Sequence, residues 1–346
     1  MTFRNSSQLG AQMSKSLQMA KVFVASVDSR LGHAVKKLLP ATDVISIQRS
    51  TDGKMSEVNK QQIENDAEIL FADVPVIIDV AYSAKKLKWA ASTWAGVEKL
   101  ISGLDESKKP PFVVTRMGGA FNRIMAEYVL GYILTKERFI IQLSQLQDKG
   151  TWDMSQYRKY RSIEGLVIGI LGLGEIGLEV ARLCNAVGMK VIGVTRSVKS
   201  DDKKVPYVSE YRTTTDIPIV LEQCDYICNI LPSTCNTRGL LSGDILSHCK
   251  NKKTIFINIG RGDIIDEDSL VKAISECWIG GAVLDVFNNE PLSEESPLWK
   301  LPNVIITPHI AGVSLTDQIA ASFVKNYELY SQNKPLQFVV DFKRGY

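Results

Sequence analysis

The stretch that decides the fold of this chain spans residues 166–177 and reads Leu-Val-Ile-Gly-Ile-Leu-Gly-Leu-Gly-Glu-Ile-Gly. Its first half is an apolar run with the length and β-branched content of a buried strand. Its second half is a Gly-x-Gly-x-x-Gly pattern, after which Val180, Ala181 and Leu183 recur with the spacing of a helix. A strand before the glycines and a helix after them are the context in which this pattern predicts a dinucleotide-binding turn.

Each glycine of this turn has its own physical task. Gly172 permits the tight turn, Gly174 lets a pyrophosphate approach the backbone, and Gly177 lets the helix and the strand pack closely. The free N–H groups and the partial positive charge at the start of the helix then face the phosphates. The predicted cofactor contacts in this turn are Gly172, Leu173, Gly174, Glu175, Ile176 and Gly177. A glycine-rich turn without a ligand is the alternative interpretation.

On both sides of this stretch, short β-branched runs alternate with helical patterns, which predicts an α/β fold with doubly wound parallel sheets. We expect strands at 22–25, 44–47, 69–71, 89–92 and 112–115, and then at 166–171, 191–194, 226–230, 254–258, 281–284 and 304–306. A long apolar-periodic segment, 120–147, predicts a connecting helix between the two sets.

The length of 346 residues indicates two domains, at about 150 residues per domain. We expect the first domain to be residues 1–119, completed by residues 315–346, because the last helical pattern is predicted to return to it. The second, residues 120–314, holds the glycine turn and is predicted to be the dinucleotide-binding domain.

The composition excludes several classes of protein. The 41 Lys and Arg residues nearly balance the 38 Asp and Glu residues, and no basic block marks a surface for nucleic acid or a membrane. With 45% hydrophobic and 23% charged residues, the chain does not have a disordered composition. No uncharged apolar run reaches the roughly 18 residues of a transmembrane helix. We therefore expect neither a nucleic-acid nor a membrane partner.

The six cysteines and the N-terminus bear on the cellular compartment. All six cysteines lie in one half of the chain without a Cys-x-x-Cys pair, which favours buried free thiols over disulfides. We expect no metal site and a cytoplasmic location. Residues 1–26 contain no acidic residue and are rich in Ser and Gln, so a mitochondrial leader is the alternative, and a disordered leader is another.

The strand that follows the glycine turn ends in Thr195, Arg196 and Ser197. An acidic residue at this place accepts hydrogen bonds from the adenosine ribose 2′-hydroxyl and repels a 2′-phosphate. A guanidinium and two hydroxyls suit a phosphate instead, so the sequence predicts NADP(H) in preference to NAD(H). The alternative is that Arg196 is a solvated loop charge and that both cofactors bind.

Polar residues follow three further strands of the second domain. His309 comes soon after 304–306, and imidazole is the side chain that changes its charge near neutral pH. Arg261 stands between two glycines after 254–258, as a planar cation suited to gripping a carboxylate. Glu290 follows 281–284. Because the carboxyl ends of parallel strands open on the binding crevice, we expect these residues to form one site.

The order of the motifs Gly-x-Gly-x-x-Gly, Gly-Arg-Gly, Asp-Val-Phe-x-x-Glu-Pro and Thr-Pro-His-Ile-Ala-Gly resembles that of the D-2-hydroxyacid dehydrogenase family. The resemblance begins at about Lys21, covers nearly all of the chain that follows, and is greatest with the glyoxylate/hydroxypyruvate reductase branch. It implies two Rossmann-like domains, the first a flavodoxin-like substrate domain, with the active-site crevice between them. It also implies a homodimer joined through the cofactor domain.

By this resemblance Arg261, Glu290 and His309 match the catalytic residues, and Arg261 and His309 also touch the cofactor and the substrate. The first-domain loop Ala95, Gly96 and Val97 matches a loop whose backbone N–H groups bind the substrate carboxylate. Trp94, beside this loop, is a candidate wall of the substrate pocket, and a core tryptophan is the equally weighted alternative. The remaining implied cofactor contacts are Leu231, Pro232, Ile259 and Asp285, the last at the nicotinamide carboxamide.

The resemblance implies an oxidoreductase that transfers hydride between nicotinamide and C2 of a small 2-oxo or 2-hydroxy acid. Such a reduction needs a hydride donor, a proton donor and a cation, for which NADPH, His309 and Arg261 are the candidates. Glu290 is expected to orient the His309 ring and to favour its protonated form. A formate-specific member is disfavoured, because that branch carries Gln where Glu290 stands.

A dinucleotide-sensing co-repressor built on the same fold is the alternative from another class, because such proteins resemble the family including the Arg, Glu and His. Sustained turnover of NADPH with a 2-oxo acid would discriminate between the two.

Overall fold

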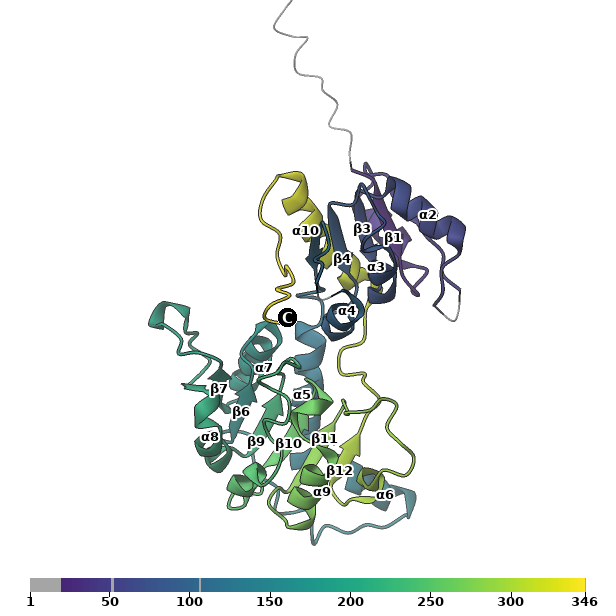
Figure 1. Ribbon diagram of the computed structural model, residues 1–346. Coiled ribbons are helices and arrows are strands. Elements are labelled where there is room, and N and C mark those ends of the chain that lie inside the picture. The colour runs from purple at the N-terminus through teal and green to yellow at the C-terminus, as the bar shows by residue number, and fades with distance from the viewer. Residues whose placement is uncertain (1–19, 51–52, 106, 346) are drawn as a thin grey trace, which may run out of the picture. The chain divides into compact units, whose positions relative to one another are not determined.

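The computed structural model describes residues 20–50, 53–105 and 107–345, and the chain divides into two compact units (Figure 1). The first unit comprises Met1–Met117 with Thr316–Val340, and the second comprises Gly118–Leu315 with Asp341–Tyr346. The sequence-based division gave all of 315–346 to the first domain, whereas the last residues group with the second unit here. The predicted leader falls largely on residues 1–19, which lie outside the described residues.

The first unit is built on a sheet of five parallel strands in the order β2-β1-β3-β4-β5. The strands are β1 (Val22–Ala25), β2 (Val44–Ser46), β3 (Ile69–Ala72), β4 (Trp89–Ser92) and β5 (Val113–Thr115). All five were predicted from the sequence. The order reverses between β1 and β3, as in flavodoxin-like doubly wound sheets, so this is the place where such a sheet opens to a ligand.

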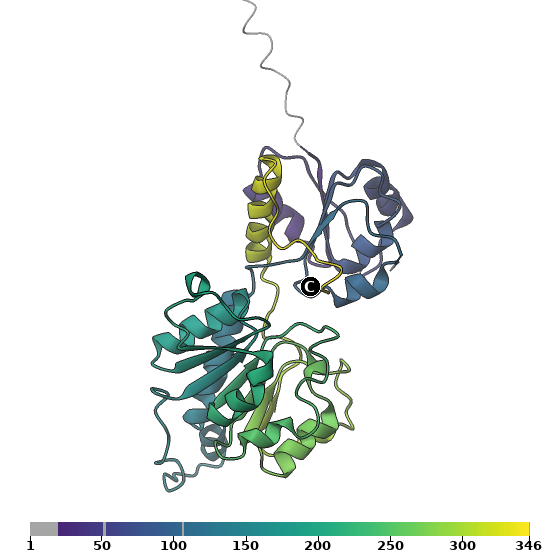
Figure 2. The same ribbon diagram turned by 60° about the vertical axis from the view of Figure 1, so that its left-hand side comes forward.

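Helices cover both faces of this sheet (Figure 2). One face carries α1 (Leu31–Leu38) and α10 (Thr316–Ser331), and the other carries α2 (Glu57–Asp66), α3 (Val74–Val80) and α4 (Glu98–Gly103). Phe323 of α10 stacks on Phe71 of β3 at 4.4 Å and on Trp89 of β4 at 5.2 Å between ring centroids. The helix α10 therefore completes the core of the first unit, although some 200 residues separate it in sequence from β5.

The second unit contains seven parallel strands in the order β12-β11-β10-β9-β6-β7-β8. They are β6 (Val167–Leu171), β7 (Lys190–Thr195), β8 (Glu210–Thr213), β9 (Tyr226–Asn229), β10 (Ile255–Asn258), β11 (Gly281–Leu284) and β12 (Val304–Ile306). Six were predicted. The seventh, β8, reads Glu-Tyr-Arg-Thr and is only half-buried at the edge of the sheet, so it lacks the apolar signal of a central strand.

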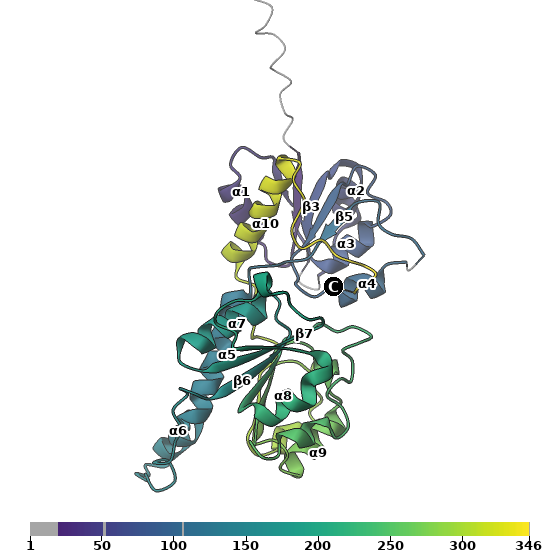
Figure 3. The same cartoon turned by 90° about the vertical axis from the view of Figure 1, so that its left-hand side faces the viewer.

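Each face of this second sheet has its own core. On one face α5 (Asn122–Glu137) and α7 (Glu175–Ala186) pack on side chains such as Ile170 and Ile257. On the other, α8 (Ile217–Gln223) and α9 (Glu267–Ser275) pack on side chains such as Ile227 and Phe256 (Figure 3). Neighbouring strand residues thus point to opposite cores, as the pleat requires. Short 3₁₀ segments lie at Asp201–Lys203, Thr214–Asp216, Ile245–Cys249, Gly262–Ile264 and Pro297–Lys300.

The single connecting helix predicted at 120–147 was wrong. The segment forms α5 and a separate helix, α6 (Ile140–Asp148), with Arg138 and Phe139 between them. Phe139 has a φ of 53°, in the left-handed region, where a residue cannot continue a right-handed helix.

All six cysteines are free, as predicted. Cys184, Cys224, Cys228 and Cys249 are buried, whereas Cys235 and Cys277 are exposed, so the predicted burial holds for four of the six thiols. Burial raises the pKa of Cys184 to about 12 and that of Cys249 to about 11, so these thiols stay protonated and unreactive. Among the described helices, none is both long and apolar enough to cross a membrane.

Candidate active site

The predicted site residues of the second unit gather along one edge of its sheet, where the parallel strands end. We call this the carboxyl edge, and define it by the segments that follow β6, β7, β9, β10, β11 and β12. The strand order reverses between β6 and β9, which is where doubly wound sheets bind their ligands. Segments far apart in the sequence therefore leave the sheet side by side.

The glycine turn between β6 and α7 is shaped to admit a phosphate group. Gly172 has a φ of +106°, and a Cβ at Gly177 would stand 2.1 Å from the carbonyl oxygen of Gly172, so neither position admits a side chain. A Cβ at Gly174 would meet nothing within 4 Å, which leaves an open cradle above the turn. In the described part of the chain, the backbone N–H groups of residues 173–176 have no acceptor. These features fit the pyrophosphate of a dinucleotide.

The side chains of the glycine turn offer less to a ligand than its backbone N–H groups do. Leu173 is buried and packs against β7, since a Cβ at Gly193 would come within 2.0 Å of it. Leu173 can thus offer a ligand only its N–H group. Glu175 is exposed and Ile176 is half-buried.

At the end of β7, the three residues predicted to read the ribose differ in what they can offer. Thr195 is buried, and its hydroxyl donates to the carbonyl oxygen of Ser197 at 2.7 Å. The Thr195 hydroxyl therefore donates within its own loop, and its contact with a phosphate stays a prediction. Arg196 and Ser197 are exposed. No acidic residue occupies the strand exit, and Asp201, further along, binds Lys204 at 2.7 Å.

Two buried asparagines, which the sequence reasoning missed, join the exits of β9 and β10. The side-chain amide of Asn229 donates to Oδ1 of Asn258 at 2.8 Å, and Asn229 Oδ1 accepts from the N–H of Leu231 at 3.2 Å. The amide of Asn258 donates to the carbonyl oxygen of Arg261 at 3.1 Å. Each Asn is the last residue of an otherwise apolar strand, and that contrast is the signal that could have found them.

These amides place the Leu231-Pro232 turn against the loop that carries Arg261. A Cβ at Gly260 would lie 2.9 Å from the carbonyl oxygen of Leu231, which shows how closely the two loops pack. Ile259 has its side chain in the core, at 2% exposure, and can meet a cofactor only through its backbone. The Arg261 side chain is half-buried, and its Nη1 donates to the carbonyl oxygen of Gly260 at 2.7 Å.

Glu290 and His309 form a hydrogen-bonded pair. Nδ1 of His309 lies 2.7 Å from Oε2 of Glu290, while Oε1 of Glu290 accepts from the N–H of Phe287 at 3.0 Å. The imidazole is 56% exposed, and its Nε2 has no hydrogen-bond partner among the described residues. A carboxylate thus holds one ring nitrogen and leaves the other available to a ligand, the arrangement expected of an acid/base histidine.

Asp285 fastens the loop of His309 to the sheet. Its carboxylate, 1% exposed, accepts from the N–H groups of Ile310 and Ala311, both at 2.9 Å, and from the hydroxyl of Thr307 at 2.5 Å. The N–H of His309 donates to the Asp285 carbonyl oxygen at 2.9 Å. His309 has a φ of +54°, an unfavourable conformation for a residue with a side chain, and these bonds maintain it.

The hydroxyl of Tyr128 on α5 extends this network and was also missed. It lies 2.6 Å from the Thr307 hydroxyl, and burial raises its pKa well above the ordinary value, so it stays a neutral hydroxyl. Next to it is an apolar hollow of about 220 Å³. The hollow is lined by Ile124, Tyr128, Ile310, Ala311, Val313 and Leu315.

The predicted substrate loop belongs to the first unit, directly after β4. Trp94 is half-buried and receives the Lys99 ammonium over its ring at 5.8 Å, so it is not a fully buried core residue. Val97 is buried, while Ala95 and Gly96 are half-buried. Within the described ranges, the N–H groups of Ala95 and Gly96 have no acceptor. Two successive free N–H groups can receive an anion such as a carboxylate.

Comparison with known proteins identifies a family and several relatives. Residues 130–311 match the family model of the D-isomer specific 2-hydroxyacid dehydrogenase NAD binding domain. The glyoxylate reductase of Thermofilum pendens is 30% identical over 301 residues, which are 85% of this chain and 86% of the relative.

Two solved structures resemble the chain over nearly its whole length. One is a D-isomer specific 2-hydroxyacid dehydrogenase from Xanthobacter autotrophicus Py2 in complex with NADPH and MES, with a TM-score of 0.79, 29% identity and coverage of 95% of this chain and 100% of the other. The second is an NADPH-dependent glyoxylate/hydroxypyruvate reductase from Sinorhizobium meliloti, in complex with NADP and sulfate. Its TM-score is 0.77 and its identity 26%, and the match covers 94% of this chain and 100% of that one.

The fold and the glycine turn define a dinucleotide-binding protein, and the family model and the relatives identify the class as oxidoreductases with a nicotinamide dinucleotide cofactor. The chain belongs to the D-isomer specific 2-hydroxyacid dehydrogenase family, whose members oxidise 2-hydroxy acids or reduce the matching 2-oxo acids. Both sheets have the α/β, Rossmann-like arrangement predicted from the sequence.

Proposed function

We propose that this protein is an NADPH-dependent reductase of small 2-oxo acids, glyoxylate or hydroxypyruvate, with Arg261, Glu290 and His309 as its catalytic residues. The observation that carries the proposal is the His309–Glu290 pair, in which Nδ1 is held at 2.7 Å and Nε2 is left open at the carboxyl edge. The names of the relatives from Thermofilum pendens and Sinorhizobium meliloti support this choice of substrate.

When bound, the cofactor supplies a hydride to C2 of the 2-oxo acid. The chain supplies everything else. His309, protonated at Nε2, donates a proton to the carbonyl oxygen, so that the carbonyl becomes a hydroxyl. Glu290 orients the ring through the hydrogen bond to Nδ1, and Arg261 provides the cation that holds the carboxylate and polarises the carbonyl. In the first unit, the N–H groups of Ala95 and Gly96 are proposed to bind the substrate carboxylate. The residues proposed to hold the cofactor are those of the glycine turn, Arg196, Ser197, the Leu231-Pro232 turn and the Ile259 backbone.

Turnover is the direct test. Purified protein should consume NADPH continuously with glyoxylate or hydroxypyruvate, measured by the loss of nicotinamide absorbance, and more slowly with larger 2-oxo acids. A dinucleotide-sensing binding protein would instead bind NADPH, seen by the change in its fluorescence, without turning over any 2-oxo acid. Binding without turnover would contradict the proposed function.

We propose that Arg196 makes NADPH the preferred cofactor over NADH, through a charge-assisted contact with the 2′-phosphate. Replacing Arg196 with Asp should lower kcat/KM for NADPH by about 10- to 100-fold and raise that for NADH, because a carboxylate repels the phosphate and accepts from the 2′-hydroxyl. Lys190 is exposed at the other end of β7 and offers the matched control. Lys190→Asp makes the same charge change and should leave the preference unmoved. An Arg196→Asp protein with unchanged preference would rule out this role.

We also propose a homodimer formed through the second unit. In the second unit, the apolar residues Ile140 and Leu143 of α6 are 52% and 42% exposed, and Trp152 is 90% exposed. Such apolar exposure is typical of a surface that is covered by a partner. Light scattering after size exclusion should give twice the mass of the chain. The free cysteines support a reducing compartment, for which we propose the cytoplasm, with a mitochondrial location as the alternative.

A further inference from the structure

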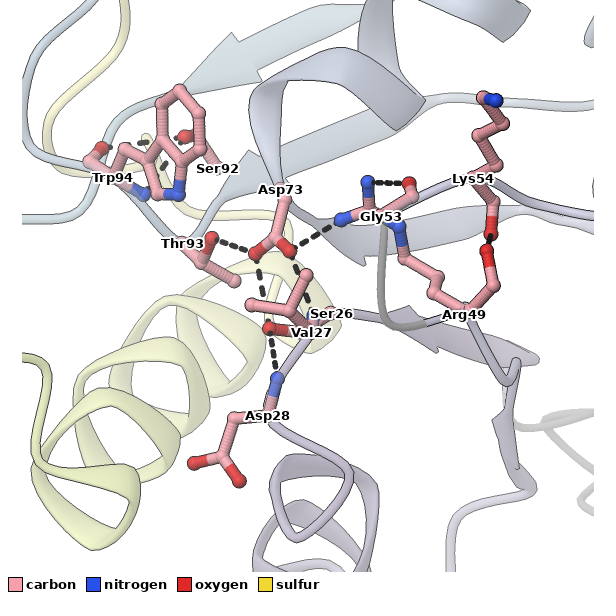
Figure 4. A network of polar contacts seen from close by, with 11 residues as sticks. Ser26, Val27, Asp28, Arg49, Gly53, Lys54, Asp73, Ser92, Thr93 and Trp94 are labelled. Atoms are coloured by element: carbon pink, nitrogen blue, oxygen red, sulfur yellow. Dashed lines mark hydrogen bonds and ion pairs between the residues drawn. The ribbon is translucent and has the colours of Figure 1, made fainter.

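A buried carboxylate lies where the strands of the first unit's sheet end. Asp73 directly follows β3, and its side chain is 3% exposed. It accepts four hydrogen bonds (Figure 4). The donors are the hydroxyl of Ser26 at 3.0 Å, the N–H of Val27 at 2.8 Å, the hydroxyl of Thr93 at 2.5 Å and Nη1 of Arg49 at 2.5 Å. These residues follow β1, β4 and β2, so one carboxylate joins the exits of four strands.

Arg49 balances the charge of Asp73. Its side chain is only 5% exposed, and its second terminal nitrogen donates to the carbonyl oxygen of Gly53. Nε of Arg49 is buried without a partner in the described structure. A buried ion pair of this kind contributes little to stability, because well-packed apolar residues in its place are often as stable or more so. Stability alone therefore does not account for the cluster.

The position of the cluster in the chain indicates its role. Thr93, which binds Asp73, is the residue immediately before the Trp94–Val97 loop. The N–H of Trp94 then donates to the Ser92 hydroxyl at 2.9 Å, and the carbonyl oxygen of Trp94 accepts from the N–H of Met117 at 2.9 Å. The loop is thus anchored up to Trp94, and the next two N–H groups are the open ones.

We propose that Asp73 and Thr93 are positioning residues, which hold the Trp94–Val97 loop so that the N–H groups of Ala95 and Gly96 receive the substrate carboxylate. This inference rests on the proposed function and assigns to it a part of the site outside the catalytic residues. A displacement of about 1 Å in such a contact is enough to weaken it greatly. Since the loop would grip the carboxylate in the ground state and the transition state alike, its loss should raise KM more than it lowers kcat.

The test removes one hydroxyl and keeps the shape of its residue. Thr93→Val deletes the bond to Asp73, leaves the three other donors, and avoids the buried unpaired charge that a change at Asp73 or Arg49 would create. We expect KM for glyoxylate to rise about ten-fold, the size of one hydrogen bond to a charged group. The Kd for NADPH should stay unchanged, because the residues proposed to bind it lie in the second unit. Thr93→Ser restores the hydroxyl and should restore KM.

Thr42 offers a matched control. It is buried in the same unit, 1% exposed, and its hydroxyl lies 3.1 Å from that of Tyr327, away from the strand exits. Thr42→Val loses a buried hydroxyl as well, but it should leave KM where it was. A similar rise of KM in Thr42→Val, or a failure of Thr93→Ser to restore it, would show a general structural effect and overturn the proposal.

Amide hydrogen exchange provides a readout that does not depend on activity. In Thr93→Val the amides of Trp94 and Met117 should exchange faster than in the wild type, and in Thr42→Val they should not. Unchanged exchange at these amides, or an unchanged KM in Thr93→Val, overturns the inference. If the wild-type protein turns over no 2-oxo acid, the proposed function fails instead, and the exchange rates still decide whether Thr93 holds the loop.

Discussion

The two edges of the second unit's sheet use charged residues in opposite ways. At the edge where the strands begin, Arg161 binds Glu137 at 2.5 Å and Asp225 at 2.8 Å, and both carboxylates are less than a tenth exposed. At the carboxyl edge, His309 is more than half exposed and keeps one ring nitrogen without a partner in the part of the chain described. The first arrangement satisfies its groups within the protein, whereas the second keeps groups available for a ligand.

Further hydrogen bonds satisfy the charged groups at the edge where the strands begin, which we call the amino edge. The hydroxyl of Tyr226 donates to Glu137 at 2.6 Å, and the N–H of Val167 donates to Asp225 at 3.0 Å. Hydrogen bonding to Glu137 raises the pKa of Arg161 above its ordinary value, and burial raises that of Tyr226. Arg161 and Tyr226 therefore stay protonated across the working range of pH. We therefore expect changes at the amino edge to affect stability, and changes at the carboxyl edge to affect activity.

The largest expected effect is at His309. Replacing it with Asn, which tolerates a positive φ, removes the proposed proton donor while the loop keeps its conformation. We expect kcat for glyoxylate reduction to fall by about 10² to 10⁴-fold, with Tm unchanged. His248 provides a matched control, since its Nδ1 also lies 2.7 Å from a carboxylate, that of Glu222. His248→Asn should retain full activity. Near-normal turnover in His309→Asn would show that another group donates the proton.

The next effect is on stability, at the other edge. Arg161→Met leaves Glu137 and Asp225 buried without their strongest partner. Because Arg161 is itself 47% exposed, water can replace part of the interaction, and we expect a loss of about 1–3 kcal/mol in the free energy of unfolding. Urea unfolding of the cofactor-free protein measures it. The values of kcat and KM for glyoxylate should not change at temperatures where the variant is folded. A variant with lower activity and unchanged stability would reverse the comparison.

The two sheets could be predicted from the sequence, whereas an edge strand and a break in a helix could not. The glycine turn and the alternation of apolar runs predicted both sheets, because central strands are buried on both faces and read as continuous apolar stretches. The edge strand β8 is polar and half-buried, so its signal is weak. The break at Phe139 carries no Gly or Pro and depends on one residue taking a left-handed φ, which local propensity does not reveal.

The candidate site could be predicted as a set of residues, but not as a network. Spacing brought His309 and Glu290 together because they follow neighbouring parallel strands. It could not show that Thr307 pairs with Tyr128, 179 residues away, or that the Thr195 hydroxyl turns back to its own loop. Partners distant in sequence are set by the packing of elements, and hydroxyl directions by local geometry. Neither the distant partners nor the hydroxyl directions produce a periodic pattern in the sequence.

The smallest expected effect concerns the orientation of the His309 ring and bears on why Glu290 belongs at the carboxyl edge. In Glu290→Gln the side-chain oxygen can still accept from the N–H of Phe287, as Oε1 does at 3.0 Å. The amide group that then replaces Oε2 is a donor and cannot accept from Nδ1 of His309, which lies 2.7 Å from Oε2. Because the ring loses the contact that holds it, we expect kcat for glyoxylate to fall by about three- to ten-fold, the size of one hydrogen bond.

Glu295 is the matched control for this change, since it is an exposed carboxylate of the same loop. Glu295→Gln should leave kcat for glyoxylate unchanged. An unchanged kcat in Glu290→Gln would show that Glu290 does not orient the ring, and the contrast between the two edges would then rest on the open Nε2 of His309 alone.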